Sequence, residues 1–84
     1  MLVFYFEYVV SQTFICKRLG PGQTPMDRPP YPGDLGRFIQ EHYSHQAWQI
    51  WLDQQTKLIN EHRLNPLDPR DRNTIEHAMR AFFA

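Results

Sequence analysis

The segment 44–65 constrains the fold most, because it has the pattern of one long amphipathic helix. Its apolar residues recur at helical spacings of three and four, interrupted by Gln55, at Trp48, Trp51, Leu52, Leu58 and Ile59. This spacing places them on one face of a helix with 3.6 residues per turn. Ser44 is a suitable N-cap, and Pro66 ends the pattern because the residue before a proline is pushed out of the α region. Two tryptophans on one helix carry much apolar surface, which the other elements must cover.

Length and charge limit the class of protein. Eighty-four residues are enough for one small domain. The apolar and charged fractions, 42% and 21%, are ordinary for a globular protein. Nine basic and nine acidic residues cancel, so we expect no nucleic-acid partner and no membrane partner. A single cysteine cannot form an internal disulfide, which favours a reducing compartment and hence the cytoplasm.

The first ten residues, MLVFYFEYVV, are an extension of doubtful status. They lack the basic start and the small-residue cleavage site of a signal peptide. They are also too short to cross a bilayer as a helix. Two interpretations stay open: a β-strand, favoured by the branched and aromatic residues, or an over-called start codon. We treat residues 11–84 as a single domain.

The remaining segments predict an α+β fold. Residues 11–19 have the composition of a short strand, and an extended piece at residues 28–31 is expected to pair with it as a loose hairpin. Apolar residues at helical spacing predict a helix over residues 34–43. A last helix is expected after Asp68 as N-cap, with Pro69 in its first position. The expected architecture is a short N-terminal antiparallel β-hairpin followed by three amphipathic α-helices.

Cys16 is the first candidate for chemistry. A lone cysteine is most often a small buried hydrophobe; the alternative is a thiolate that reacts with oxidants or binds a metal. Lys17 and Arg18 follow it directly, and they lower the pKa of the thiol if their charges lie close. On a strand Lys17 points to the opposite face, which leaves Arg18 as the better-placed neighbour.

His42 and His45 are three residues apart, a spacing that lets two imidazoles share a metal on one helix. Because Ser44 is expected to break the helix between them, we favour surface or helix-end histidines over a paired metal site. The sequence contains no phosphate-binding, dinucleotide-binding, zinc-protease or nucleophile-elbow motif. Without a recognisable set of nucleophile, base and orienting group, the residues argue against a stand-alone enzyme.

Several motifs, in order and spacing, resemble the bacterial Fe(2+)-trafficking protein family over most of the chain, from about Ser11 to Phe83. They are FICK at 14–17, DRPPYPGDLG at 27–36, AW at 47–48 followed by Trp51, QT at 55–56, LINE at 58–61 and RLN at 63–65. The combination is highly specific. Family members usually begin shortly before the strand, so residues 1–9 have no counterpart. We hypothesise that translation starts at Val10, and a native protein with an intact Met1 would contradict this.

The resemblance implies a monomeric, cytosolic bacterial protein that mediates between iron acquisition and iron-requiring processes, such as Fe–S cluster synthesis or repair. It also implies protection of the clusters from oxidants, which in the family is tied to the single cysteine that matches Cys16. The iron ligands do not transfer, so Cys16, His42 and His45 stay weak candidates. Fe(2+) would be bound weakly or transiently, because a carrier must release its cargo. Its implied partners are Fe–S cluster proteins or their assembly and repair machinery.

Two other functions stay open. One is a small interaction protein that docks on Fe–S assembly or repair partners without holding iron. An exposed aromatic patch and a lack of convergent carboxylates or histidines would favour it. The other is a thiol-dependent redox protein, which requires Cys16 to be exposed and to have a depressed pKa.

Overall fold

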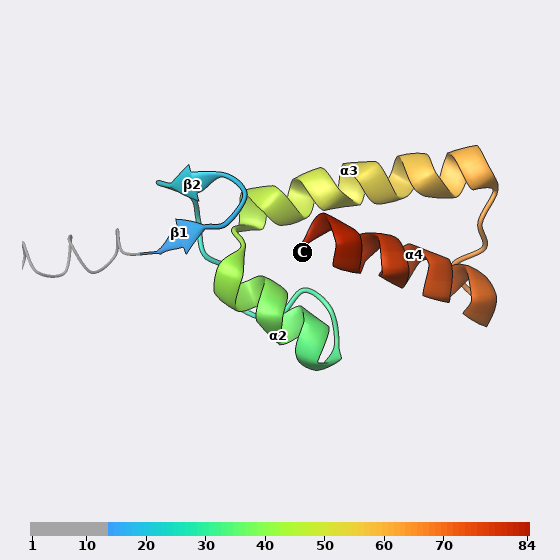
Figure 1. Ribbon diagram of the computed structural model, residues 1–84, viewed down its shortest axis with the longest axis horizontal. Coiled ribbons are helices and arrows are strands. Elements are labelled where there is room, and N and C mark those ends of the chain that lie inside the picture. The colour runs from blue at the N-terminus through green and yellow to red at the C-terminus, as the bar shows by residue number, and fades with distance from the viewer. Residues whose placement is uncertain (1–13) are drawn as a thin grey trace, which may run out of the picture. The chain divides into compact units, whose positions relative to one another are not determined.

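A computed structural model describes residues 14–84 as two compact units, one ending at Ala47 and one spanning Trp48–Ala84. Its elements, labelled in Figure 1, are β1 (Ile15–Cys16), β2 (Gly20–Pro21), α2 (Gly33–His42), α3 (His45–His62) and α4 (Pro69–Phe82). This order confirms the predicted α+β fold, a short hairpin followed by three helices. The extension 1–10 and the proposed start at Val10 lie outside the described residues.

The hairpin is shorter and more local than predicted. β1 and β2 have two residues each and pair antiparallel, with Ile15 opposite Pro21 and Cys16 opposite Gly20 (Figure 1). Gly20 has a φ of 81°, a left-handed conformation that lets the chain reverse at once. The prediction that residues 28–31 form the second strand was wrong. Consecutive prolines there lack the N–H groups that a ladder needs.

α2 follows the proline-rich loop, and a close backbone contact joins the two. A Cβ on Gly36 would lie 1.5 Å from the carbonyl oxygen of Tyr31. No other residue type therefore fits at position 36 without moving the loop or the helix. One turn further along, Ile39 is completely buried.

α3 begins as predicted but ends earlier. Ser44 is the N-cap, because its Oγ accepts a hydrogen bond from the N–H of Ala47 at 3.1 Å. The helix ends at His62 rather than at the predicted Asn65. Arg63 has a φ of 52°, and the N–H of Leu64 donates to the carbonyl of Ile59 at 3.0 Å. This is a Schellman ending, so the left-handed Arg63, rather than the proline three residues later, terminates α3.

A hydrogen-bonded turn connects α3 to α4. The side chain of Asp68 accepts from the N–H of Arg70 at 2.8 Å, and Pro69 opens the helix, as predicted. Asn65 also ties the turn together: its N–H donates to Asp71 at 2.7 Å, while its side-chain oxygen accepts from the N–H of Leu67 at 3.0 Å. The turn holds Leu67 with 85% of its surface exposed.

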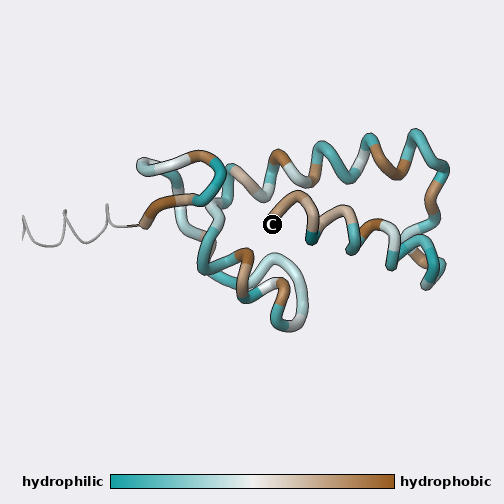
Figure 2. Tube along the Cα trace, viewed as in Figure 1, coloured by the Kyte–Doolittle hydropathy of each residue, from teal (hydrophilic) through white to brown (hydrophobic). Residues whose placement is uncertain are grey.

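Aromatic side chains pack α3 against the end of α4. The rings of Trp51 and Phe82 lie 5.5 Å apart, and Trp48 stacks on Phe83 at 5.9 Å. Trp51 and Phe83 are buried, whereas Trp48 is half-buried. Figure 2 shows hydrophobic positions recurring along both helices between hydrophilic ones. Within residues 14–84, no helix combines the length and apolar composition needed to cross a bilayer.

Candidate functional site

The candidate site is centred on the thiol of Cys16, which lies at the end of β1 and has 1% of its surface exposed. The turn after β1 folds back over the sulfur, so that the backbone N–H groups of Arg18 and Leu19 donate to it. Sequence predicted a strand through residue 19. The strand instead ends at Cys16, and the tight turn that follows it supplies the N–H groups of Arg18 and Leu19.

Ser44, 28 residues further along the chain, completes the environment of the sulfur. Its backbone N–H lies 3.3 Å from the Sγ of Cys16, and its hydroxyl is a further donor to the thiol. The same hydroxyl oxygen caps α3, and Ser44 is completely buried. The sequence identified Ser44 as a cap but carried no sign of its contact with Cys16.

Backbone hydrogen bonds hold this junction in place. The N–H of Lys17 donates to the carbonyl of His42 at 2.9 Å, which joins the hairpin to the end of α2. The N–H of His45 donates to the carbonyl of Thr24 at 2.8 Å, and the amide of Gln46 bonds both the N–H and the hydroxyl of Thr24 at 3.0 Å. These backbone and side-chain hydrogen bonds hold the hairpin, the loop at Thr24 and the start of α3 together around Cys16.

Burial and hydrogen bonding act on the thiol in opposite directions. Burial raises the pKa of Cys16, because it penalises the charged thiolate. The hydrogen bonds that the sulfur accepts lower it, and they prevail, so that the pKa lies below its ordinary value of 9.0. Arg18 lowers the pKa of Cys16 through a hydrogen bond from its backbone N–H. From the sequence we expected the charge of its guanidinium to have this effect. The ammonium of Lys17 lies 5.3 Å from the ring centre of Phe38.

Tyr43 is a buried neighbour of the site that sequence reasoning did not single out. Burial raises the pKa of its phenol, the charge of Arg18 lowers it, and Cys16 raises it again. On balance the pKa of Tyr43 lies above its ordinary value of 10.0, and a charged thiol at Cys16 is one of the causes that disfavour ionisation of the phenol.

The two candidate histidines lie on either side of the helix break. His42 ends α2, with Nε2 4.0 Å from the carboxylate of Glu41 and its ring 4.6 Å from Phe38. His45 is the first residue of α3 and is exposed. The predicted break at Ser44 is thus confirmed. Over residues 14–84, no group of three or more His, Cys, Asp or Glu side chains is arranged to hold a metal ion.

Comparison with known proteins places the chain in a family. A family model described as bacterial Fe(2+) trafficking matches residues 10–84. The chain belongs to this family. The match includes Cys16, His42 and His45, and it confirms the resemblance seen in the sequence motifs.

Curated members of the Fe(2+) trafficking family are similar along most of the chain. A "Probable Fe(2+)-trafficking protein" of Acidithiobacillus ferrooxidans is 49% identical, over 88% of this chain and 80% of the relative. Relatives of the same name occur in Halorhodospira halophila, at 47% identity over 88% of this chain and 82% of the relative. In Alkalilimnicola ehrlichii the identity is 53%, over 81% of this chain and 77% of the relative.

Proposed function

We propose that this chain handles Fe(2+) in the cytoplasm, between iron acquisition and iron-requiring processes such as Fe–S cluster synthesis or repair. The role is non-catalytic, and the cargo is held weakly or transiently by a monomer. Membership of the bacterial Fe(2+) trafficking family carries this proposal. Fe–S cluster proteins, or the machinery that assembles and repairs them, are the proposed recipients.

Within this role we assign protection against oxidants to Cys16. A lowered pKa increases the thiolate fraction, and the thiolate is the form that reacts with oxidants and metals. At 1% exposure, however, the sulfur is shielded from bulky reagents. Small oxidants such as hydrogen peroxide are therefore the reactants that suit this site best.

The burial of Cys16 also bears on the alternative of a general thiol redox protein. That function needs a thiol that is both acidic and accessible to a second protein. The lowered pKa meets the first condition, and the 1% exposure does not meet the second. A docking role is the better second candidate, and an open pocket next to α2, described below, favours it.

An anaerobic Fe(2+) titration by calorimetry tests the iron-handling role. We expect saturable, weak binding by the full chain. Cys16→Ser, His42→Gln and His45→Gln should be titrated in parallel, with His77→Gln as the control, since His77 is an exposed histidine on α4. Binding that is lost only in Cys16→Ser makes the thiolate a ligand, and loss only in a histidine variant identifies that imidazole. No binding by the full chain would refute iron carriage.

A second experiment tests the protective role. A [4Fe–4S] protein is exposed to hydrogen peroxide with the full chain or with Cys16→Ser, and cluster loss is followed by absorbance. We expect the full chain to slow the loss and Cys16→Ser to slow it less. Equal protection by the two proteins would refute the assignment of this role to the thiol.

A further inference from the structure

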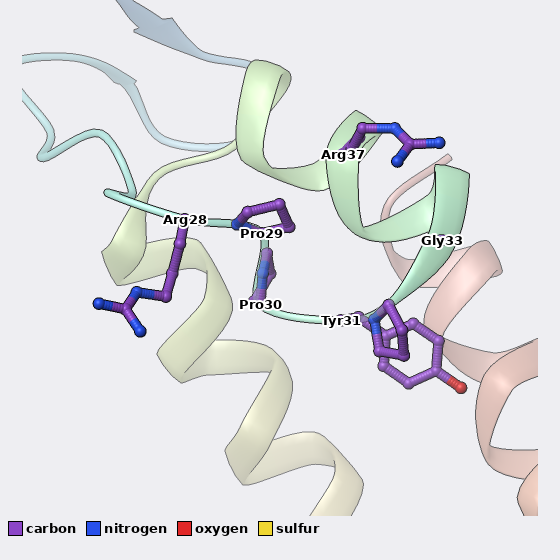
Figure 3. A pocket seen from close by; sticks show the side chains of 7 residues that line it. Arg28, Pro29, Pro30, Tyr31, Gly33 and Arg37 are labelled. Carbon is purple, nitrogen blue, oxygen red and sulfur yellow. The ribbon is translucent and has the colours of Figure 1, made fainter.

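An open pocket lies beside the start of α2, within the unit that ends at Ala47. Its volume is about 320 Å³, near the lower end of the range for small ligand sites. The residues that line it are Arg28, Pro29, Pro30, Tyr31, Pro32, Gly33 and Arg37. We call it the Arg28–Arg37 pocket (Figure 3).

The Arg28–Arg37 pocket is built from a segment with little freedom to move. Three of its residues are prolines, whose rings fix φ near −65°. The carbonyl of Tyr31 lies against the backbone of Gly36, where even a methyl group would not fit. Because this wall is already ordered, a ligand would lose little free energy in fixing it.

The pocket combines apolar rings with positive charge. Figure 3 shows the rings of Pro29 and Pro30 between the two arginine side chains, and the ring of Tyr31 beyond them below the start of α2. Neither Arg28 nor Arg37 is buried, and no carboxylate is among the lining residues. Within the described part of the chain, the guanidinium of Arg28 makes no ion pair. Such a surface is complementary to a ligand that has both apolar groups and carboxylates.

Arg37 keeps donors for a ligand although it already has a partner. Its Nη2 contacts one carboxylate oxygen of Asp34, with both side chains largely exposed. A guanidinium has five N–H donors in a fixed fork, so this contact leaves Nε and Nη1 for another carboxylate. An exposed pair of this kind is also weak, and a competing carboxylate can displace it.

The directions of the two guanidinium groups decide between a compact and an extended ligand. In Figure 3 they point away from one another, on opposite sides of the rings of Pro29 and Pro30. A small polycarboxylate needs donors that converge on it. An extended peptide has side chains spaced along its backbone, so it can place one carboxylate at each arginine and an apolar side chain between them.

We propose that the Arg28–Arg37 pocket docks an extended acidic segment of a partner protein. The apolar side chain of the segment lies on the proline and tyrosine rings, and its flanking carboxylates pair with Arg28 and Arg37. Aromatic-lined grooves recur in the recognition of extended peptides. This site goes beyond the iron-handling role, since such a segment docks whether or not the chain holds iron.

An NMR titration of the ¹⁵N-labelled full chain without iron tests the proposal. The probe is a capped hexapeptide, Glu-Glu-Leu-Leu-Glu-Glu, and its matched control has lysine in place of every glutamate. We expect the acidic peptide to shift the amide resonances of residues 28–37, and the lysine peptide to leave them unchanged. Absence of shifts at millimolar acidic peptide, or equal shifts with both peptides, would overturn the proposal.

Arginine variants test whether peptide binding depends on the two guanidinium groups. Arg28→Glu and Arg37→Glu should each weaken peptide binding about tenfold, whereas Arg28→Lys, which keeps the charge, should weaken it less. Arg72→Glu is the control, because Arg72 is exposed on α4 and does not line the pocket. Equal loss in the control would overturn the proposal.

Citrate, at the same carboxylate concentration as the peptide, separates a protein segment from a free anion. We expect it to bind more weakly than the peptide. If citrate shifts the same resonances with the same affinity, the pocket is a small-anion site and the docking proposal fails. Because no iron is present, none of these outcomes depends on the Fe(2+) titration described above.

Discussion

The backbone N–H of Ser44 donates to the Sγ of Cys16 across 3.3 Å, and the hydroxyl of the same serine both donates to the sulfur and caps α3. The buried hydroxyl of Ser44 thus lowers the pKa of the Cys16 thiol and also caps the N-terminus of α3. The two effects can be measured separately.

Replacement of this hydroxyl should affect both properties. We expect Ser44→Ala to lower the free energy of unfolding by about 1–2 kcal/mol, the usual cost of losing an N-cap, and to raise the pKa of Cys16. Urea denaturation measures the first effect, and thiolate absorbance near 240 nm measures the second. Thr56→Ala is the matched control, because its hydroxyl bonds the carbonyl of Leu52 on an exposed face of α3. A pKa unchanged in Ser44→Ala would contradict the assigned hydrogen bond.

The lowered pKa of Cys16 predicts a pH dependence of stability. Between the pKa of the folded thiol and its ordinary value of 9.0, the unfolded chain binds more protons than the folded one. Stability from this group therefore rises with pH across that window, and it is lost as pH falls through the folded pKa. We expect the difference in unfolding free energy between the native chain and Cys16→Ala to be larger at pH 9 than at neutral pH. A difference that does not change with pH would refute a depressed thiol pKa.

The contact between Gly36 and Tyr31 predicts a strongly destabilising substitution. In Gly36→Ala the new methyl group would lie 1.5 Å from the carbonyl oxygen of Tyr31, and we expect a loss of about 3 kcal/mol or more. Gly33→Ala is the comparison: it meets open space, and only its φ of 81° is strained, so the expected loss is about 1–2 kcal/mol. Thermal denaturation ranks the two variants, and the reverse order would contradict this account.

The left-handed residue that ends α3 predicts a stabilising substitution. Arg63 has a φ of 52°, which glycine adopts without steric cost. We expect Arg63→Gly to raise the free energy of unfolding by up to about 1 kcal/mol. Arg72→Gly, an exposed helical position in α4, should lower it by about 1 kcal/mol. Chemical denaturation of both variants gives the sign of each change in the free energy of unfolding. A destabilised Arg63→Gly would argue against a left-handed residue at the end of α3.

The sequence predicted those features that depend on neighbouring residues. Ser44 and Asp68 were recognised as caps because capping acts within one turn. β2 was missed because a strand of two residues has no periodicity to detect. The end of α3 was misplaced because an arginine in a left-handed conformation resembles any other arginine in sequence.

The candidate site was less predictable than the fold. Cys16 was identified as a residue type, but the donors that set its pKa are a tight turn and a serine 28 residues away. The Arg28–Arg37 pocket was missed for another reason. Its loop was assigned as part of a strand, so its prolines were not considered as the wall of a binding surface.

The distance in sequence between Cys16 and Ser44 has a kinetic consequence. Two-residue strands are too short to persist alone, and the hairpin is held in part by bonds that close a loop of 28 residues. Such contacts have a high entropic cost and are expected to form after the local helices. If the contacts of Cys16 form after the folding transition state, Cys16→Ala should speed unfolding while leaving the refolding rate nearly unchanged.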